Sequence, residues 1–414
     1  MQRKTIVIVA NLDTRGEDFK LVKDLIEKRG HRALFLDFSM QGVPFYPGDI
    51  TCEEVALRGG ATSIEEVREF YTCERRKATE IMIRGASSIV REMYRNGEIQ
   101  GIIGIGGATT SLVATTIMRQ LPVGFPKLMT SSIAAHPAFV SDCVGTRDIT
   151  MHNTIFDVVE MNPLLRRQIV KAVGAICGMV ELLDAEPMEE TRPLVAITSC
   201  GLLERCVQAA VGLMRDKGYE PVPCHAQGLG DRAMDEFIRE GLFAGVIDLS
   251  PRGVAEQLFG GDCAAGDDRL LAASESGIPQ VISLAGLDML SHHGSVEDAA
   301  ERFRGRTTFR YDEWRLEVRT SPEELVQVAR VMAERLNKAT APATVLIPVQ
   351  GWSWLSQPGR PFYDPEADAA FADEMKRLVK PQVSIKEVHL PLDTPEFAKI
   401  AVEEYHSLHT QHTR

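Results

Sequence analysis

The sequence has no long hydrophobic run, no CxxC pair and no excess of basic residues. No window approaches 18 consecutive apolar residues, so we expect no transmembrane helix. The eight cysteines are scattered without metal-site spacing, which in a chain of 414 residues predicts reduced thiols, a cytoplasmic protein and no metal site. The net charge of −12 argues against nucleic-acid binding and against an anionic membrane surface.

The sequence also lacks a signal peptide pattern and the familiar catalytic motifs. Residues 4–10 are a short apolar run without a small-residue cleavage site, and we expect them to form a first β-strand. There is no GxSxG, no HExxH and no GK[ST]. No reaction class follows from motifs, and whether the protein is an enzyme stays open.

What the sequence does have is a repeated alternation of strand-type and helix-type segments. The run at 4–10 is followed by helical spacing over 17–29 and by a second strand at 33–38. The alternation restarts at 194, after a linker at 186–193. We therefore predict an α/β protein with mainly parallel sheets and two domains, 1–187 and 193–414, with a crevice between them.

The stretch from Gly101 to Thr116 is the main candidate for ligand binding. An apolar strand passes through a turn of small residues into a helix, which is the pattern that presents backbone N–H groups to an anion. The turn contains Gly104, Gly106, Gly107, Ala108, Thr109 and Thr110. The alternative interpretation is a tight turn that needs small residues only for packing, and these residues alone do not decide between the two.

Other loops are expected near this turn. In a doubly wound sheet the loops after the strands' carboxyl ends share one rim, which places Asp13, Thr14 and Arg15 beside the glycine turn. A further short strand at 126–132 ends in hydroxyl residues, among them Ser131. We expect a loop over 134–147 and a helix over 148–159.

Two residues of the second half are candidates for catalysis. His225 follows a predicted strand and is a candidate general base, and Asp248 ends another strand. The alternatives are a loop histidine bonded to backbone and an aspartate in a local ion pair.

Several segments together resemble the Tm-one-like ATP-binding family over about residues 4–405. They include GIGGATTSL, VGTRDI, GYEPVPCHAQGLGDRAMDEFI and AGVIDLS. The family comprises bacterial proteins and the N-terminal region of the tomato mosaic virus resistance protein. The resemblance implies two Rossmann-like domains, nucleotide binding in the N-terminal half and a homodimer. Carried over by position, it points to the loop at 13–14, the turn at 104–110, Gly145, Thr146 and Asp148, and to His225 and Asp248 in the second half.

Two functions remain open. The leading hypothesis is a protein that binds ATP, with Mg²⁺, or a related phosphorylated metabolite. The alternative is an enzyme of small-molecule catabolism, a hydrolase, lyase or isomerase acting on a phosphorylated or carboxylated substrate. A non-catalytic regulatory protein is a third interpretation.

Overall fold

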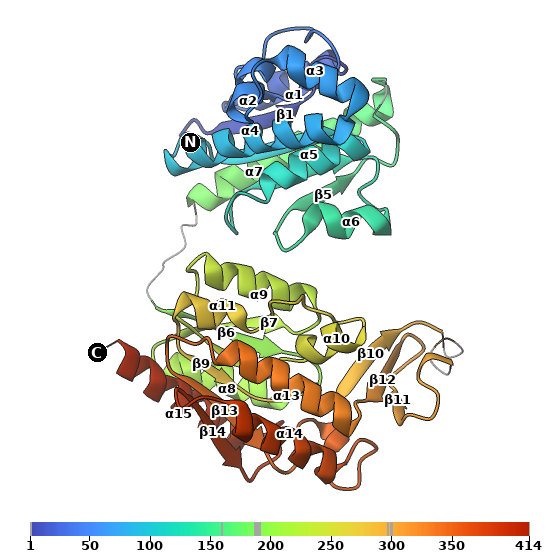
Figure 1. The fold of residues 1–414 in the computed structure, drawn as a ribbon. Helices are drawn as coiled ribbons and strands as arrows, with labels where there is room; N and C mark the ends of the chain where they lie inside the picture. Colours follow the sequence, from blue (N-terminus) through green and yellow to red (C-terminus); the bar gives the residue numbers. More distant parts are fainter. Residues whose placement is uncertain (1, 159, 186–191, 296–297, 299–300, 414) are drawn as a thin grey trace. The chain divides into compact units, whose positions relative to one another are not determined.

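A computed structural model describes residues 2–158, 160–185, 192–295, 298 and 301–413 (Figure 1). The chain divides into two compact units, Met1–Glu189 and Glu190–Arg414. Each unit is built on a parallel sheet covered by helices, so the predicted α/β architecture with two domains is confirmed. The predicted linker at 186–193 lies mostly outside the described residues, and the crevice predicted between the domains stays a prediction.

The N-terminal unit contains a five-stranded, all-parallel sheet in the order β2-β1-β3-β4-β5. Its strands are β1 (Thr5–Ala10), β2 (Arg32–Asp37), β3 (Gly101–Gly106), β4 (Lys127–Ser131) and β5 (Thr150–Asn153). Its helices are α1 (Gly16–Lys28), α2 (Cys52–Arg58), α3 (Ile64–Cys73), α4 (Arg75–Arg95), α5 (Ala108–Met118), α6 (Pro137–Val144) and α7 (Pro163–Ala185).

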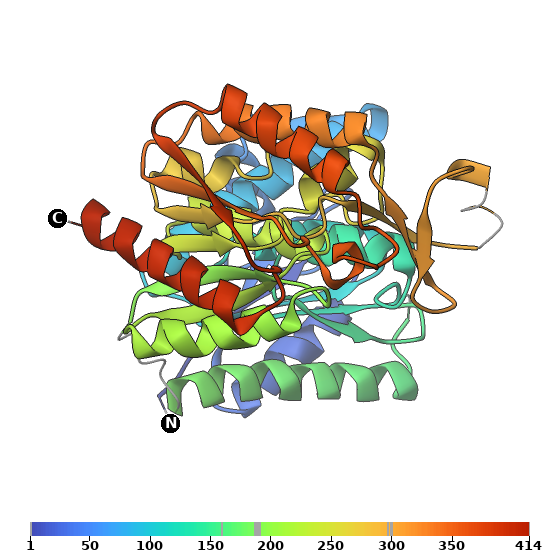
Figure 2. The same ribbon diagram turned by 90° about the horizontal axis from the view of Figure 1, so that it is seen from below.

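Side-chain alternation along the strands explains how the helices cover this sheet. Val7 and Val9 of β1 pack with α2, α3, α4 and α5 on one face. Ile6 and Ile8 pack with α1 and α7 on the other face, and Figure 2 shows α1 (blue) beside the long α7 (green). The helices that follow β1 and β3 therefore lie on opposite faces, so the strand order reverses between these two neighbouring strands.

Two expectations near β5 are wrong. Residues 137–144 form helix α6 instead of a loop, because Pro137 at its first turn starts a helix well. Residues 150–153 form strand β5 instead of a helix, because this segment pairs in parallel with the open edge of β4. Pairing with a remote strand has overridden the local pattern.

The C-terminal unit has a six-stranded, all-parallel sheet in the order β14-β13-β9-β8-β6-β7 and a three-stranded antiparallel sheet. The strands are β6 (Leu194–Ser199), β7 (Glu220–His225), β8 (Gly245–Asp248), β9 (Gln280–Ile282), β10 (Met289–His293), β11 (Thr308–Arg310), β12 (Arg315–Arg319), β13 (Ala343–Pro348) and β14 (Val383–Val388). The helices are α8 (Glu204–Asp216), α9 (Leu229–Arg239), α10 (Gly253–Phe259), α11 (Leu271–Ser276), α13 (Pro322–Leu336), η1 (Trp354–Ser356), α14 (Pro365–Leu378) and α15 (Pro395–His412).

The smaller sheet of this unit, β10-β12-β11, stands at one end of it (Figure 1). In the C-terminal unit the strand order reverses between β6 and β8, as it does between β1 and β3 in the first. Among the helices that the structure describes, none combines the length and apolar character needed to cross a membrane.

Candidate functional site

The loop after β1 is fixed by the carboxylate of Asp13. This carboxylate accepts hydrogen bonds from the backbone amides of Gln41 and Gly42, at 2.8 and 3.0 Å. The Asp13 amide in turn donates to the hydroxyl of Ser39 at 3.0 Å. Two amide donors offset much of the negative charge of Asp13, and the loops after β1 and β2 are held together at the carboxyl edge of the sheet.

The glycines of the turn after β3 have different functions. A Cβ on Gly104 would lie 2.7 Å from the Cβ of Ala114, and one on Gly106 would lie 2.5 Å from the Cβ of Thr110. These two positions therefore need glycine for close packing of strand on helix. A Cβ on Gly107 would meet nothing closer than ordinary van der Waals distance, with the Ser132 hydroxyl nearest at 3.9 Å.

Helix α5 begins at Ala108, within the predicted turn of small residues. Its N-cap is Gly107, which supplies no side-chain cap, and the first backbone bond runs from the Ser111 amide to the Gly107 carbonyl at 2.9 Å. Ala108 and Thr109 are exposed. The amides of this first turn and the helix dipole therefore face outward, which favours an anion.

Ser131 stabilises the buried side of this turn. Its hydroxyl lies 2.7 Å from the Ser111 hydroxyl and accepts a bond from the Ile133 amide at 3.1 Å. The Ser111 hydroxyl donates to the Gly107 carbonyl at 2.8 Å. Both serines are fully buried. The predicted residue Ser131 thus positions the turn and does not line an open surface.

A cavity of about 470 Å³ lies at the point where the strand order reverses, beside the first turn of α5. It brings together the predicted loop Asp13, Thr14 and Arg15 with the predicted turn from Gly107 to Thr110. The other lining residues are Asn11, Phe38, Met40, Gln41, Tyr71, Arg75, Ser132, Ile133 and Asp157. A crevice at such a reversal is the usual ligand position in open α/β sheets.

Sequence reasoning missed several polar residues of this cavity, among them Arg75 and Asp157. Arg75 starts α4, and its guanidinium lies over the ring of Tyr71 at 4.6 Å. The Asp157 carboxylate accepts a bond from the Ser132 hydroxyl at 3.3 Å. Arg75 lies in the region from 63 to 96, whose spacing predicts one helical segment, and Asp157 lies in the helix expected over 148–159, so no local signal marked either as a site residue.

Besides Gly104, Gly106 and Ser131, three further predicted nucleotide-binding residues do not reach this cavity. Asp148 pairs with Lys127 at 2.7 Å and accepts from the Gly124 amide, at the amino end of the strands. Burial lowers the pKa of Lys127, and the bond to Asp148 opposes that shift. Gly145 ends α6 with a φ of +57°, and Thr146 follows it. The ion pair of Asp148 stabilises the opposite edge of the sheet, and none of these three residues lines the cavity.

The two predicted catalytic residues are not brought together either. His225 is exposed at the end of the edge strand β7, and β6 separates it from the strand that carries Asp248. Asp248 is buried, accepts from the Thr198 hydroxyl at 2.9 Å and pairs with Arg269 at 2.5 Å. Catalysis by this pair stays a prediction that the arrangement does not favour.

Arg269 belongs to a buried cluster of one cation and three carboxylates. Its guanidinium also lies 3.0 Å from Asp231 and 3.6 Å from Asp235. Burial raises the pKa of Asp235 to about 7, opposed by Arg269. Because these buried charges are paired with one another, we interpret the cluster as a structural ion-pair network. Within the described ranges, no three His, Cys, Asp or Glu side chains are grouped to hold a metal ion.

Comparison with known proteins gives matches along nearly the whole chain. A family model described as "Uncharacterised protein family (UPF0261) N-terminal domain" matches residues 4–185, and the corresponding C-terminal domain model matches residues 192–409. The chain is 35% identical over 396 residues to a UPF0261 protein of Clostridium tetani, covering 95% of this chain and 96% of that protein. A UPF0261 protein of Rhizobium meliloti is 31% identical over 411 residues, covering 98% and 99%.

Two further matches are more distant or partial. The ToMV resistance protein Tm-1(GCR237) of Solanum lycopersicum is 29% identical over 347 residues, which cover 82% of this chain and 46% of that protein. Among solved structures, the glycosyltransferase SsfS6 of Streptomyces sp. SF2575 matches with a TM-score of 0.17 at 14% identity, covering 73% of this chain and 85% of that one. A score this low carries no argument about fold or function.

Proposed function

The chain belongs to the UPF0261 family, and from that premise we propose that its N-terminal unit binds ATP or a related phosphorylated metabolite. The resemblance to the Tm-one-like family is confirmed by the tomato relative, whose matching region covers most of this chain. The proposed ligand places its phosphates in the 470 Å³ cavity, against the first turn of α5.

One observation carries this proposal: a helix N-terminus without a side-chain cap opens onto a cavity at the reversal of strand order. Gly107 keeps the approach to the first-turn amides free, since a side chain here would enter the space that a phosphate needs. The hydroxyl groups of Thr109 and Thr110 stand on the same turn and add donors.

The charges around the cavity support an anionic ligand despite the net charge of −12. Arg15 and Arg75 line it, and both are suited to phosphate oxygens. The two lining carboxylates already accept hydrogen bonds, Asp13 from two amides and Asp157 from Ser132 and the Val158 amide. Their local negative charge is therefore partly offset.

These carboxylates also fit the Mg²⁺ that accompanies ATP. Mg²⁺ is commonly bound through one or two carboxylates together with substrate phosphates. Each of these carboxylates accepts the hydrogen bonds described above through a single oxygen, Oδ2 of Asp13 and Oδ1 of Asp157. We propose that one of these carboxylates, most directly Asp157 beside the turn, holds the cation when it arrives with the nucleotide.

Gly107→Val tests the proposal, because the extended backbone at this position accepts valine and an added Cβ has no neighbour closer than 3.9 Å. The new side chain would take up space beside the first-turn amides. Equilibrium dialysis with labelled ATP, with and without Mg²⁺, should show saturable binding to the wild-type chain. The variant should lose at least tenfold in affinity, about 1.4 kcal/mol.

Gly201→Val is the matched control in the C-terminal unit. Gly201 is exposed in the loop after β6, and an added Cβ there meets nothing within 4 Å. This variant should bind ATP as the wild type does. Absence of saturable binding to the wild type, or loss in Gly201→Val but not in Gly107→Val, would remove the proposed site.

A further inference from the structure

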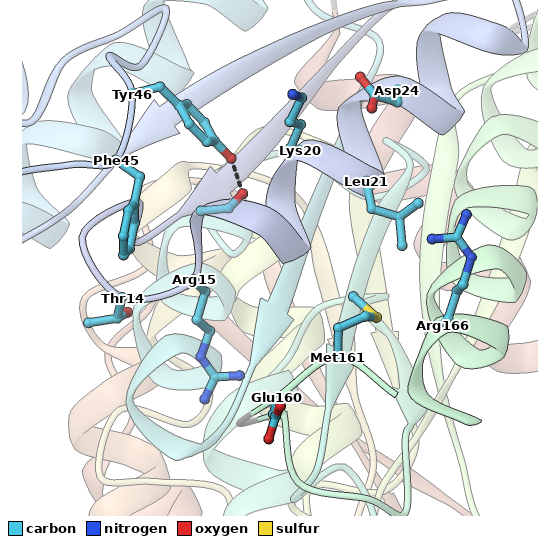
Figure 3. A pocket seen from close by; sticks show the side chains of 11 residues that line it. Thr14, Arg15, Lys20, Leu21, Asp24, Phe45, Tyr46, Glu160, Met161 and Arg166 are labelled. Atoms are coloured by element: carbon cyan, nitrogen blue, oxygen red, sulfur yellow. Dashed lines mark hydrogen bonds between the residues drawn. The ribbon is translucent and has the colours of Figure 1, made fainter. Parts of the chain in front are cut away.

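A second hollow of about 810 Å³ adjoins the proposed phosphate cavity (Figure 3). The two share Thr14 and Arg15, so the loop after β1 forms a common wall. The remaining residues of this hollow come from α1, from the loop after β2, from the segment before α7 and from the first turn of α7: Gly16, Lys20, Leu21, Asp24, Phe45, Tyr46, Glu160, Met161 and Arg166. A ligand held at the α5 turn and longer than its phosphates can extend past Arg15 into this space.

Phe45 gives the hollow a fixed aromatic surface. Its side chain lies so close to Gly16 that a Cβ there would be 2.9 Å from the Phe45 Cβ. Its backbone amide donates to the Leu12 carbonyl at 3.1 Å, and the neighbouring Tyr46 hydroxyl donates to the Gly16 carbonyl. Phe45 is nevertheless 71% exposed. One side of the residue is therefore held against the start of α1 while much of its ring remains available for stacking.

Across the hollow from Phe45 lies a mixed apolar and basic wall. Leu21, Met161 and Arg166 point toward the same space in Figure 3. An aromatic surface on one side and aliphatic side chains on the other favour a flat, partly apolar group. A bare sugar phosphate offers no such group, because its surface consists of hydroxyls and charged oxygens.

The charges of this hollow disfavour a second polyanion. Arg15, Lys20 and Arg166 are accompanied by the carboxylates of Asp24 and Glu160, so the positive and negative charges that line the hollow nearly cancel. A mixture of donors and acceptors suits a neutral ring with polar edges and a sugar with hydroxyls. The larger hollow also borders a helix start without a side-chain cap, that of α1 at Arg15 and Gly16. Phe45 packs against Gly16, so this helix start is less open than the start of α5 at Gly107.

We propose that the larger hollow binds the base and ribose of the ligand whose phosphates lie at α5, with the base stacked on Phe45. This inference rests on the proposed function and narrows it, because it makes the ligand a nucleotide and excludes a sugar phosphate. Arg15, which is shared by both spaces, lies where the ribose joins the phosphate chain.

Binding of ATP and of inorganic tripolyphosphate to Phe45→Ala tests this assignment. Base-on-aromatic stacking is sequence-tolerant and strong enough that its removal should weaken ATP binding roughly tenfold. Tripolyphosphate has no base, so its affinity should not change. Phe45→Trp keeps an aromatic surface and should retain ATP affinity. Val43→Ala is the matched control, since Val43 is 81% exposed on the same loop and does not line the hollow.

The outcomes separate this inference from the proposed function. If Phe45→Ala binds ATP as tightly as the wild type while Gly107→Val loses both ligands, the phosphate site stands and the base site is refuted. Equal weakening of ATP and tripolyphosphate by Phe45→Ala also refutes the base site, because it shows a general effect on the loop. If the wild type binds neither compound, both proposals fall.

Discussion

Arg269 is a cation with a fully buried side chain in the C-terminal unit, surrounded by Asp231, Asp235 and Asp248. One guanidinium cannot neutralise three ionised carboxylates in a medium of low polarity, so one of the acids is best accommodated in its protonated form. Burial raises the pKa of Asp235 to about 7 and also raises the pKa of Asp231. Asp235 is the more weakly paired of the acids, at 3.6 Å from Arg269.

This arrangement predicts a defined pH dependence of stability. The pKa of Asp235 is 3.8 in the unfolded reference and about 7 in the folded chain, so between these values the folded state retains a proton that the unfolded state has lost. The free energy of unfolding therefore falls as the pH rises through this window. Asp235→Asn removes that fall. The difference in unfolding free energy between variant and wild type should therefore change with pH. It should favour the variant by about 1–3 kcal/mol more at pH 8 than at pH 5.

Urea unfolding followed by tryptophan fluorescence measures this effect, because the three tryptophans, at 314, 352 and 354, all lie in the C-terminal unit. Asp216→Asn, at the exposed end of α8, is the control and should leave the pH profile unchanged. A profile for Asp235→Asn that runs parallel to that of the wild type would show that Asp235 does not hold the proton.

The glycine turn shows how far sequence reasoning reaches for single residues. The pattern of small residues predicted both the turn and its place at the rim, and Gly107 to Thr110 do line a cavity. The sequence did not separate Gly104 and Gly106, which pack tightly against neighbouring side chains, from Gly107, where an added Cβ meets no close neighbour. That difference depends partly on remote contacts, such as that between Gly104 and Met129, which no local pattern contains.

At the level of elements, the junction between α3 and α4 adds a residue to the site that the sequence did not mark. The region from 63 to 96 reads as one helical segment, but the structure ends α3 at Cys73 and starts α4 at Arg75. The break places Tyr71 and Arg75 at the cavity, with the guanidinium over the ring. The cation is thereby oriented before any ligand arrives, which reduces the entropy lost on binding.

Arg75→Gln should weaken ATP binding about tenfold, because a charge-assisted hydrogen bond to phosphate is lost. Affinity should also become less sensitive to salt. Arg76→Gln is the matched control: Arg76 is the next residue, its side chain is 93% exposed and it pairs with Glu80 at 2.7 Å. Isothermal titration calorimetry at two salt concentrations measures both quantities. Equal losses in the two variants would indicate only a general effect of net charge.

Element prediction succeeded where local pattern and tertiary environment agree. The unit from β1 through α1 to β2 follows its pattern of apolar residues within one or two positions. Over 291–320, charged and turn-rich residues concealed the antiparallel strands β10, β11 and β12. Their pairing is set by contacts such as the bonds of the Ser291 hydroxyl to Glu317 at 2.9 Å, across the two strands. Such cross-strand pairs cannot be read from one segment alone.

On the scale of the whole molecule, two sheets of related topology have different carboxyl edges. At the reversal between β1 and β3 the edge carries Gly107, an open helix start and a cavity. At the reversal between β6 and β8 the corresponding edge carries buried polar side chains, with Thr198 bonded to Asp248 and the Ser250 hydroxyl bonded to the Ala285 carbonyl. The sequence predicted both sheets. It did not predict that buried polar side chains occupy the carboxyl edge between β6 and β8, because that depends on tertiary packing.

This contrast predicts where a nucleotide protects the chain from hydrogen exchange. With free ATP at about 100 times its Kd, exchange of the amides from Ala108 to Thr110 should slow by up to roughly 100-fold, because these amides donate to phosphate in the bound state. The segment from Val43 to Tyr46 should also be protected, because the base covers Phe45.

Hydrogen exchange in the loops after β6 and β8 should not change when ATP is added. Exchange measured by mass spectrometry on the full chain, with and without ATP, resolves these peptides, and protection confined to the loops after β6 and β8 would place the ligand on the other unit.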